Sequence, residues 1–458
     1  MSVRKITKRQ FDTYCYSRHP FLRMLSMEIS WFEGFDRKIL AVIVLDNTDG
    51  DYGYVILGRD AQKMFRCIDL GSEFYKTPDE AEKALRYKIL KYGNDGLVLY
   101  PQGDEKKIPN EILIPCVDAQ QLHPYFAVLI NEPRFEAARN LINEIAYSYV
   151  DVDGNYIKEF QTLGFDARIW ELYLYVYLYD SGALIIRDKV APDYHISIFG
   201  NECFIEAVTV NPSQSKERPD PAPPKTNAEI ATLMNDYMPI KYGSTLYSKL
   251  QKKYWEKPHV AGKPFVLAIH DYHMPGSMTW SRTGLCDYLY GIRNRVQKSD
   301  HGTLELVTEK IENHSWEGKI IPSNFFAQIG AENVSAVLFS NAATITKFNR
   351  MGKLGGLGSK NVRMIRQCFL YNPDPTALVP IPITMDVDSP DYEESWSESL
   401  TMYHNPNAKH PVNPDWFRDI SHIWYDEKAG FTGRTTPYDV LSSLTMTLSS
   451  DGNEQLEE

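Results

Sequence analysis

The stretch from Phe165 to Pro212 constrains the fold of this chain more than any other. Apolar residues recur at helical spacing from about Ala167 to Tyr179, and an Asp-Ser-Gly sequence then stops the helix. Two strand-like runs follow, Tyr194 to Phe199 and Glu202 to Val210, and the Gly-Asn pair between them is typical of a tight hairpin turn. The sequence therefore predicts a buried helix packed on a β-hairpin.

Three of the carboxylates in this stretch occupy positions that suggest a function, namely Glu171 in the helix, Asp193 just before the first strand and Glu206 in the second. A carboxylate in so apolar a helix is costly to bury without a partner, so Glu171 is expected to reach solvent or to face a cation. Hairpin pairing brings Asp193 and Glu206 to the same end of adjacent strands, and Glu171 can approach from the helix. Because Mg²⁺ and Mn²⁺ prefer oxygen ligands, we predict that these three acids bind one of these ions and support attack of water on a phosphodiester.

The ordered set of a helix-borne glutamate, a Pro-Asp pair at a strand and a glutamate in the next strand resembles the PD-(D/E)XK nuclease superfamily. The resemblance covers roughly residues 160 to 275. It implies a restriction-endonuclease-like core made of a helix, a three-stranded hairpin-rich sheet, a helix and a further strand. It also implies that Glu171, Asp193 and Glu206 are catalytic and bind the metal.

The chain departs from the family pattern at one position. The family's lysine, two residues after the second acid, helps to position the nucleophilic water and to offset developing charge, but Val208 stands there. Some nucleases of this group carry a displaced lysine on the following helix, which corresponds here to Ile240 to Trp255, and Lys249 is the candidate. In the alternative interpretation, Lys249, Lys252 and Lys253 form a solvated helix face.

The length of 458 residues exceeds what a single hydrophobic core usually fills, so we expect several domains. We predict an N-terminal α+β domain at 1–130, a nuclease-like core at 131–300 and a C-terminal α/β extension at 301–458. The expected fold class is α/β (α+β), with a mixed sheet flanked by helices. The N-terminal domain offers no recognisable chemistry, and we expect it to bind a protein partner or to regulate the core.

Local patterns predict further elements outside the central stretch. Continuous apolar runs predict buried strands at Phe265 to Asp271 and Ala336 to Ser340, with a helix at Asn324 to Ala331 before the second. In the N-terminal domain the pattern predicts three strands and a helix, at Met27 to Phe35, Ile39 to Asp46, Tyr52 to Gly58 and Pro78 to Lys91.

The second informative stretch runs from Lys347 to Arg366 and contains no acid. Its cations are Lys347, Arg350, Lys353, Lys360, Arg363 and Arg366. Four glycines among them would let the backbone approach an anion closely. The GxxxxGK[ST] order of a P-loop is absent, which favours contact with a nucleic-acid backbone over a nucleotide-phosphate cradle. The other alternative is a mobile basic surface loop.

The formal net charge of −11 argues against general affinity for nucleic acid, so such binding requires a local basic patch. No apolar run of about 18 residues is present and the first ten residues lack an apolar signal core, so we expect a cytoplasmic protein that does not enter a membrane. Two histidine pairs, His270 with His273 and His404 with His410, are weaker candidates for metal ligation.

These observations lead to two hypotheses of different classes. The first is a metal-dependent nuclease that uses Mg²⁺ or Mn²⁺ to hydrolyse phosphodiester bonds in DNA, for which prokaryotic genome defence or a mobile element would be a suitable setting. The second is a catalytically inactive nuclease-fold protein that acts as a scaffold for nucleic acid or protein. The three acids favour the enzyme, and the loss of the lysine at Val208 favours the scaffold.

Overall fold

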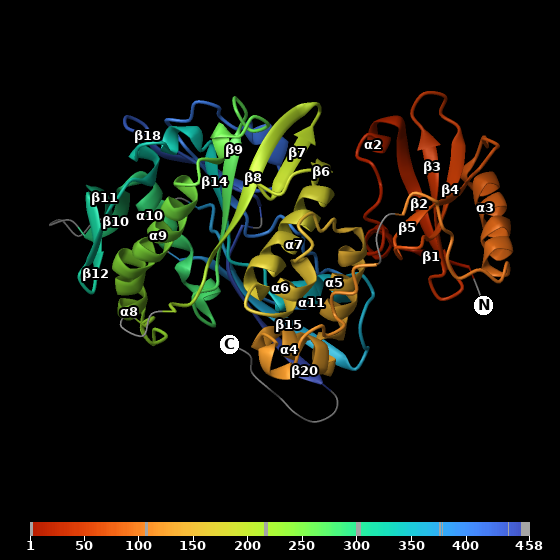
Figure 1. The fold of residues 1–458 in the computed structure, drawn as a ribbon, viewed down its shortest axis with the longest axis horizontal. Coiled ribbons are helices and arrows are strands. Elements are labelled where there is room, and N and C mark those ends of the chain that lie inside the picture. The colour runs from red at the N-terminus through yellow and green to blue at the C-terminus, as the bar shows by residue number, and fades with distance from the viewer. Residues whose placement is uncertain are drawn as a thin grey trace.

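The computed structural model describes residues 3–105, 109–214, 219–298, 304–374, 377, 379–437 and 439–449. Its centre is an eight-stranded mixed sheet with helices on both faces, and a separate antiparallel sheet lies at the N-terminal end of the chain (Figure 1). The predicted fold class, a mixed sheet flanked by helices with an N-terminal α+β unit, is therefore confirmed.

The N-terminal unit is a five-stranded antiparallel sheet covered by one helix. Its strands follow each other in chain order, and their bounds are β1 Arg4–Ile6, β2 Ser26–Gly34, β3 Ile39–Asp46, β4 Tyr52–Arg59 and β5 Phe65–Leu70. Helix α3 (Pro78–Gly93) is capped by Thr77, and it buries Leu85 and Ile89 against β3 and β4. In Figure 1 this unit lies to one side of the rest of the molecule.

A layer of helices links this unit to the central sheet. The helices are α4 Pro124–Asn131, α5 Glu136–Ser148, α6 Tyr156–Gln161 and α7 Phe165–Asp180. Helix α4 packs on α5 within the main core, so these residues of the predicted N-terminal domain lie with the central layer. Helix α7 is buried on nearly all sides, and the indole of Trp170 donates a hydrogen bond to the carbonyl of Ala268 in the sheet.

The central sheet has the strand order β19-β18-β17-β14-β9-β8-β7-β6. In chain order its strands are β6 Leu184–Ile186, β7 Tyr194–Ile198, β8 Asn201–Val210, β9 Phe265–Asp271, β14 Ala336–Ser340, β17 Thr401–His404, β18 Ser421–Asp426 and β19 Gly430–Arg434. Strands β6, β7 and β8 form an antiparallel meander, whereas β8, β9 and β14 are parallel. Strands β14, β17, β18 and β19 thus extend the same sheet that begins with β6.

The two faces of the sheet bury different helices, because side chains alternate along each strand. Val266 and Ala268 of β9 face the core that contains α7. Leu267 and Ile269 face the core that contains α9 (Met238–Leu250) and α10 (Gly284–Tyr290). A short helix α8 (Asn227–Thr232) continues through a π-helical turn into α9. The chain order is therefore α7, β6, β7, β8, α9 and β9, in which the last strand is parallel to β8.

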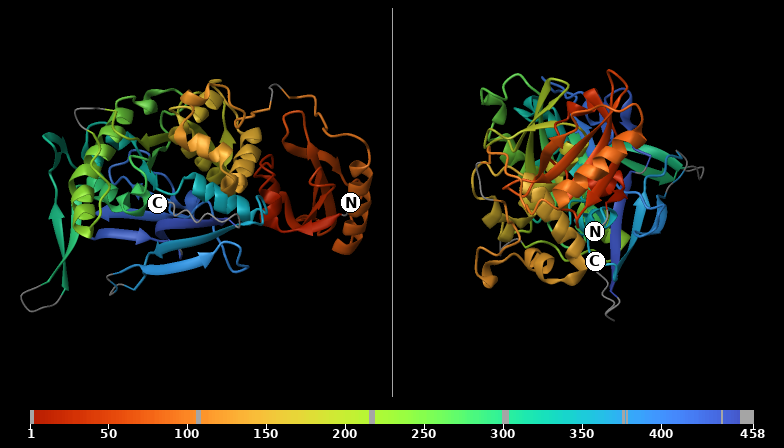
Figure 2. Two further views of the ribbon diagram at one scale, coloured as in Figure 1. Left: turned by 90° about the horizontal axis from the view of Figure 1, so that it is seen from below. Right: turned by 90° about the vertical axis from the view of Figure 1, so that its right-hand side faces the viewer.

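Three smaller sheets complete the structure. The hairpin of β10 Ile292–Lys298 and β11 Leu304–Lys310 projects from the end of the molecule opposite the N-terminal unit (Figure 2). Beside it lies the hairpin of β12 Asn313–Trp316 and β13 Lys319–Pro322. A three-stranded antiparallel sheet consists of β16 Ile381–Asp386, β15 Val362–Leu370 and β20 Val440–Ser449.

Two interpretations of local structure from the sequence are wrong. The helix predicted at Asn324 to Ala331 is absent, because Asn324 and Gly330 adopt left-handed backbone conformations and only two 3-10 turns form there. The surface loop that was one alternative for the basic segment is absent from Ile345 to Leu354, where the chain forms helix α11. This helix begins at the capping hydroxyl of Thr344 and packs on α5. By contrast, β9 and β14 have the bounds predicted from the sequence.

Candidate functional site

Asp193 and Glu206 lie side by side where β7 and β8 separate. Tyr194, the first residue of β7, pairs with Ile205 of β8, so the residues on either side of that pair are neighbours across the hairpin. The Asp193 carboxylate accepts a hydrogen bond on Oδ2 from the backbone N–H of Ala207 at 2.7 Å. The structure therefore brings two of the predicted acids together through the strand register.

Glu206 is 4% exposed and only one of its carboxylate oxygens is engaged. Oε1 accepts hydrogen bonds from the Lys249 ammonium and from the Tyr254 hydroxyl, both at 2.6 Å. Oε2 is buried and has no hydrogen-bond partner within the described parts of the chain. A buried carboxylate oxygen without a partner is energetically costly, and such positions commonly take a water molecule or a cation.

Lys249 reaches this carboxylate from α9, as the sequence interpretation of a displaced lysine requires. Leu246 and Leu250 are buried in the core between α9 and the sheet, which turns this side of the helix toward β8. The Lys249 side chain is mostly buried and forms an ion pair with Glu206. It therefore does not belong to a solvated helix face, which was the alternative interpretation of this lysine. Val208, where the family's lysine would stand, is itself a buried core residue.

The electrostatics of Asp193 are unfavourable for a negative charge. Burial raises the pKa of Asp193 well above its ordinary value, and the nearby charges of Glu206 and Glu171 raise it further. The ammonium of Lys249 and the N–H of Ala207 oppose this shift without cancelling it. A cation placed between the two carboxylates would reverse the balance, because it would favour the ionised form of both.

Glu171 faces a cation, which is one of the two environments expected for it from the sequence. Its carboxylate accepts hydrogen bonds from the Arg168 guanidinium at 2.8 and 2.7 Å and from the Tyr149 hydroxyl at 3.0 Å. Burial raises the pKa of Glu171, and Arg168 opposes this effect. Both oxygens are thus occupied, so Glu171 acts on Asp193 through its charge.

Throughout the described ranges, no group of three or more His, Cys, Asp or Glu side chains is arranged so that it could hold a metal ion. The structure therefore supplies two open carboxylates, Asp193 and Glu206, where the sequence predicted three ligands. Mg²⁺ is commonly bound by one or two carboxylates and completes its shell with water and substrate phosphate, so two carboxylates are sufficient for that ion.

Sequence reasoning missed several residues of this site. Tyr254 lies beyond the end of α9 in a 3-10 turn, and no spacing rule marks its contact with Glu206. Arg187 follows β6, and its guanidinium lies over the rings of Tyr149 and Tyr194 at 4.3 and 5.3 Å from their centroids. It also donates a hydrogen bond to the backbone carbonyl of Asp193 at 3.1 Å. Only Arg168 had a sequence signal, because it precedes Glu171 by three residues on one helix face.

The basic segment from Lys347 to Arg366 does not present its cations as predicted. Lys347 and Arg350 are only 1% and 4% exposed. Both pair with Glu394, the Lys347 ammonium at 2.7 Å and the Arg350 guanidinium at 2.7 and 2.9 Å. The predicted contact of Lys347 and Arg350 with a nucleic-acid backbone is corrected accordingly, since buried cations that are held by an internal acid cannot reach phosphate.

The remaining predicted cations are divided between interior and surface. The Lys353 ammonium donates to the backbone carbonyls of Ser359 and Val362, so it closes the turn after α11. Lys360 is exposed, and Arg363 is exposed but paired with Asp386 at 2.6 Å. The glycines of this segment serve packing as well. A Cβ at Gly352 would lie 2.4 Å from the carbonyl oxygen of Ala137, which explains why α11 can pack closely on α5.

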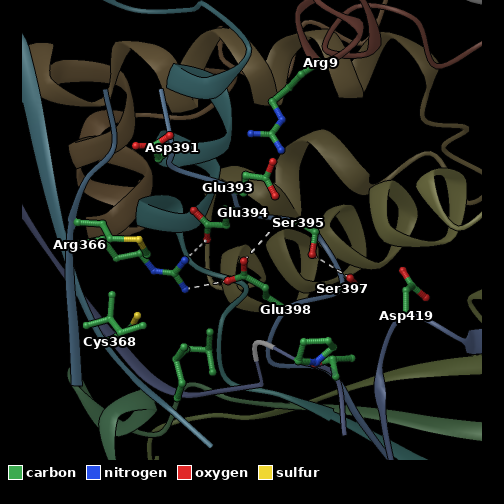
Figure 3. Close-up of a pocket in the computed structure, with 16 residues that line it drawn as sticks. Arg9, Arg366, Cys368, Asp391, Glu393, Glu394, Ser395, Ser397, Glu398 and Asp419 are labelled. Atoms are coloured by element: carbon green, nitrogen blue, oxygen red, sulfur yellow. Dashed lines mark hydrogen bonds and ion pairs between the residues drawn. The ribbon is translucent and has the colours of Figure 1, made fainter. Parts of the chain in front are cut away.

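A cavity of about 420 Å³ lies beside the buried ion pairs of Glu394 (Figure 3). Arg366 points into it and binds Glu398 at 2.9 Å. Its wall also carries three further carboxylates, those of Asp391, Glu393 and Asp419. Carboxylates repel phosphate, so this lining does not favour a nucleic-acid backbone on this side of the molecule.

Three of the four histidines considered as weaker candidates for metal ligation have other partners. His270 accepts a hydrogen bond from the backbone N–H of Ala343, whereas His273 is held by Asp271 at 2.7 Å through Nδ1. His404 contacts His422 at 2.8 Å between Nε2 and Nδ1, a partner that the sequence did not indicate. Burial lowers the pKa of His404 to about 3, with the nearby charges of His422 and Arg434 acting in the same direction, so its ring is neutral at physiological pH.

No family model, no curated protein and no solved structure matches this chain. Within the described residues, no helix has both the length and the apolar character needed to cross a membrane.

Proposed function

We propose that this protein is a metal-dependent nuclease of the PD-(D/E)XK type, which hydrolyses phosphodiester bonds in DNA with Mg²⁺ or Mn²⁺. The observation that carries the proposal is the arrangement of Asp193, Glu206 and Lys249. Glu206 retains a buried oxygen with no hydrogen-bond partner among the described residues, and the hydrogen bond from Ala207 to the adjacent Asp193 uses only Oδ2. The Lys249 ammonium lies 2.6 Å from the other oxygen of Glu206. The order α7, β6, β7, β8, α9 and β9 is also the core order that the sequence resemblance implies.

The residues present fit a divalent ion. Glu206 Oε2 is a buried oxygen without a partner, and the side-chain hydrogen bond of Asp193 involves only Oδ2. The donor set is purely carboxylate oxygen, which matches the preference of Mg²⁺ and Mn²⁺. When bound, the ion would act as a Lewis acid on the phosphodiester and would lower the pKa of a bound water molecule.

The chain's own residues would orient and balance the charges of this reaction. Lys249 and Tyr254 hold Glu206 through Oε1, which leaves Oε2 directed away from both donors. The Lys249 ammonium is also close enough to Asp193 to lower its pKa, so it lies beside both carboxylates. From this place it can orient a water molecule and offset negative charge that develops on the phosphate. Glu171, whose two oxygens are held by Arg168 and Tyr149, would not be a ligand in this arrangement.

The inactive scaffold is the competing proposal, and cleavage assays separate the two. Wild type should cut duplex DNA when Mg²⁺ or Mn²⁺ is present and should be inactive in EDTA. Asp193→Asn and Glu206→Gln preserve shape and should abolish cleavage, whereas Lys249→Met should lower kcat by about 10²–10³-fold. Lys241→Met is the matched control, because Lys241 lies on the same helix and pairs with Asp220 at 3.0 Å, away from the carboxylate pair.

Isothermal titration of Mg²⁺ and Mn²⁺ gives a readout that is independent of activity. Metal binding should be lost in Glu206→Gln and retained in Lys249→Met and Lys241→Met. The nuclease proposal fails if wild type cleaves neither DNA nor RNA with either metal, or if the Asp193→Asn/Glu206→Gln double variant cleaves at the wild-type rate.

A further inference from the structure

A polyanion that approaches an acidic chain needs a local cluster of cations, and α11 does not supply it. Of the six cations between Lys347 and Arg366, only Lys360 and Arg363 are exposed, and Arg363 is paired with Asp386. The exposed cations near the carboxylate pair are therefore the relevant ones.

The segment after α9 borders the candidate site along its length. Tyr254 donates its hydroxyl hydrogen bond to Glu206 at 2.6 Å. Five residues later, His259 Nε2 lies 3.0 Å from the backbone carbonyl of Ala191, two residues before Asp193. The segment is thus anchored beside both carboxylates, through Glu206 itself and through the residue two positions before Asp193.

This segment is strongly basic. Between Lys249 and Lys263 the sequence contains five lysines and one acid, Glu256, which is a net charge of +4 in a chain whose net charge is −11. Lys249 is used by Glu206, and Lys263 by Glu202. Of the remaining three, Lys252 and Lys253 are exposed and Lys257 is partly exposed.

These three lysines are weakly neutralised. Lys253 pairs at 3.4 Å with Glu256, but both side chains are more than half exposed, so solvent screens the pair. Lys252 and Lys257 form no ion pair within the described ranges. Their ammonium groups are therefore available for an anion in solution.

A fourth cation, Arg187, lies beside Asp193. The Arg187 guanidinium is positioned by Tyr149 and Tyr194, and its Nη1 binds the Asp193 carbonyl. Its Nε is buried and has no hydrogen-bond partner among the described residues. Positive charge therefore lies next to each of the two carboxylates, where it can contact the phosphates that neighbour a scissile bond.

We propose that duplex DNA binds across the carboxylate pair with its backbone on Lys252, Lys253, Lys257 and Arg187, a surface we call the site rim. This inference relies on the proposed function for the reaction, but binding to the rim can be measured without any reaction. Because contacts to phosphate carry no sequence information, the rim would give affinity and orientation and leave sequence choice to other residues.

Binding of a short fluorescently labelled duplex is measured by anisotropy in EDTA over a series of salt concentrations. The Lys252→Ala/Lys253→Ala/Lys257→Ala variant should weaken binding and reduce the slope of log affinity against log salt by about 0.9 for each phosphate contact, or about 2.7 in total. The matched control is Lys360→Ala/Arg363→Ala/Lys409→Ala, which removes the same charge from exposed positions elsewhere. Its salt slope should stay within about 0.5 of wild type.

Cleavage kinetics give a second readout. The rim variant should raise KM and leave kcat near the wild-type value, because its lysines touch neither carboxylate. A rim variant with wild-type affinity and slope overturns the inference, as does a control variant that loses as much affinity as the rim variant. It is equally overturned if wild type binds RNA or a protein but not duplex DNA.

The two proposals fail in distinguishable ways. Rim-dependent binding of duplex DNA by a wild type that never cleaves supports the rim and removes the nuclease. Metal-dependent cleavage with an unchanged KM in the rim variant supports the nuclease and removes the rim. Thermal unfolding and circular dichroism of each variant establish that it is folded, which is expected because each substituted residue of the rim and control variants is exposed or partly exposed.

Discussion

Two buried glutamates of this protein, Glu206 and Glu394, meet their environments in different ways. Each accepts an ion pair from a lysine, at 2.6 Å for Glu206 and 2.7 Å for Glu394. Glu394 is bound on both oxygens by Arg350, and Arg366 and the Tyr392 hydroxyl contact it as well. Glu206 is bound on one oxygen only. The protein therefore supplies partners for both oxygens of Glu394, whereas Oε2 of Glu206 has none among the described residues.

The difference shows how a structural ion cluster can be distinguished from a candidate site. Burial raises the pKa of Glu394, but Arg350, Arg366 and Lys347 outweigh this effect and hold it well below the ordinary value. Asp193, next to Glu206, has its pKa raised well above the ordinary value by burial and by neighbouring acids. Functional sites commonly retain such uncompensated groups, because a ligand completes them.

The largest expected effect is on stability at Glu394. Glu394→Gln leaves the buried cations Lys347, Arg350 and Arg366 without their shared acid, which should cost about 3–5 kcal/mol of unfolding free energy. Glu206→Gln keeps an acceptor for Lys249 and Tyr254 and should change stability by less than about 1 kcal/mol. Urea unfolding in EDTA measures both. Equal costs would show that Glu206 is as structural as Glu394, and the comparison would fail.

An intermediate effect is expected from Asp193→Asn, and its sign depends on pH. Because the folded pKa of Asp193 is raised, the protonated carboxyl favours the folded state below the unfolded pKa of 3.8. This contribution is lost as the pH rises through the folded value. Without metal, Asp193→Asn should therefore be more stable than wild type at neutral pH, and the difference should vanish in acid. Thermal unfolding in EDTA over a pH series tests this prediction, and Mg²⁺ should reverse the order by stabilising wild type alone.

The smallest expected effect concerns the two tyrosines. Tyr254→Phe removes one of the two hydrogen bonds to Glu206 and should cost about 1–2 kcal/mol. Tyr392→Phe removes a bond to Glu394, which keeps its cations, so the cost should be nearer 0.5 kcal/mol. Urea unfolding of both variants, with Tyr247→Phe at an exposed position as control, compares them. A larger loss of unfolding free energy for Tyr392→Phe than for Tyr254→Phe would contradict the view that the cations around Glu394 suffice to hold it.

Local sequence patterns predicted much of the fold around the site. The helix expected from about Ala167 to Tyr179 extends from Phe165 to Asp180, and the expected hairpin forms β7 and β8. These elements depend on apolar periodicity and turn residues that lie close together in the chain. The pattern failed at Asn324 to Ala331, where a short apolar run was mistaken for a helix although positive φ angles interrupt it.

The candidate site was only partly predictable, because some of its contacts join residues that are distant in the sequence. Strand pairing makes Asp193 and Glu206 neighbours, but the two-residue turn that sets this register is Phe199-Gly200, one residue before the Gly-Asn turn predicted from the sequence. The hydrogen bond from Tyr149 to Glu171 could not be predicted without knowing how α5 packs beside α7, because the two residues lie 22 positions apart. The sequence therefore indicated which carboxylates were candidates and left open which of them would remain free.

The chain by itself determined which residues carry charge and which local elements hold them. Only the tertiary structure decided which charges were neutralised. Lys249 meets Glu206 across 43 residues, and Arg350 meets Glu394 across 44, so the two pairs look alike in the sequence. The free energy of a charge depends on its burial and on every partner that surrounds it, and both arise from contacts between distant segments. For that reason Arg350 became a structural cation, while Lys249 came to lie beside an open carboxylate.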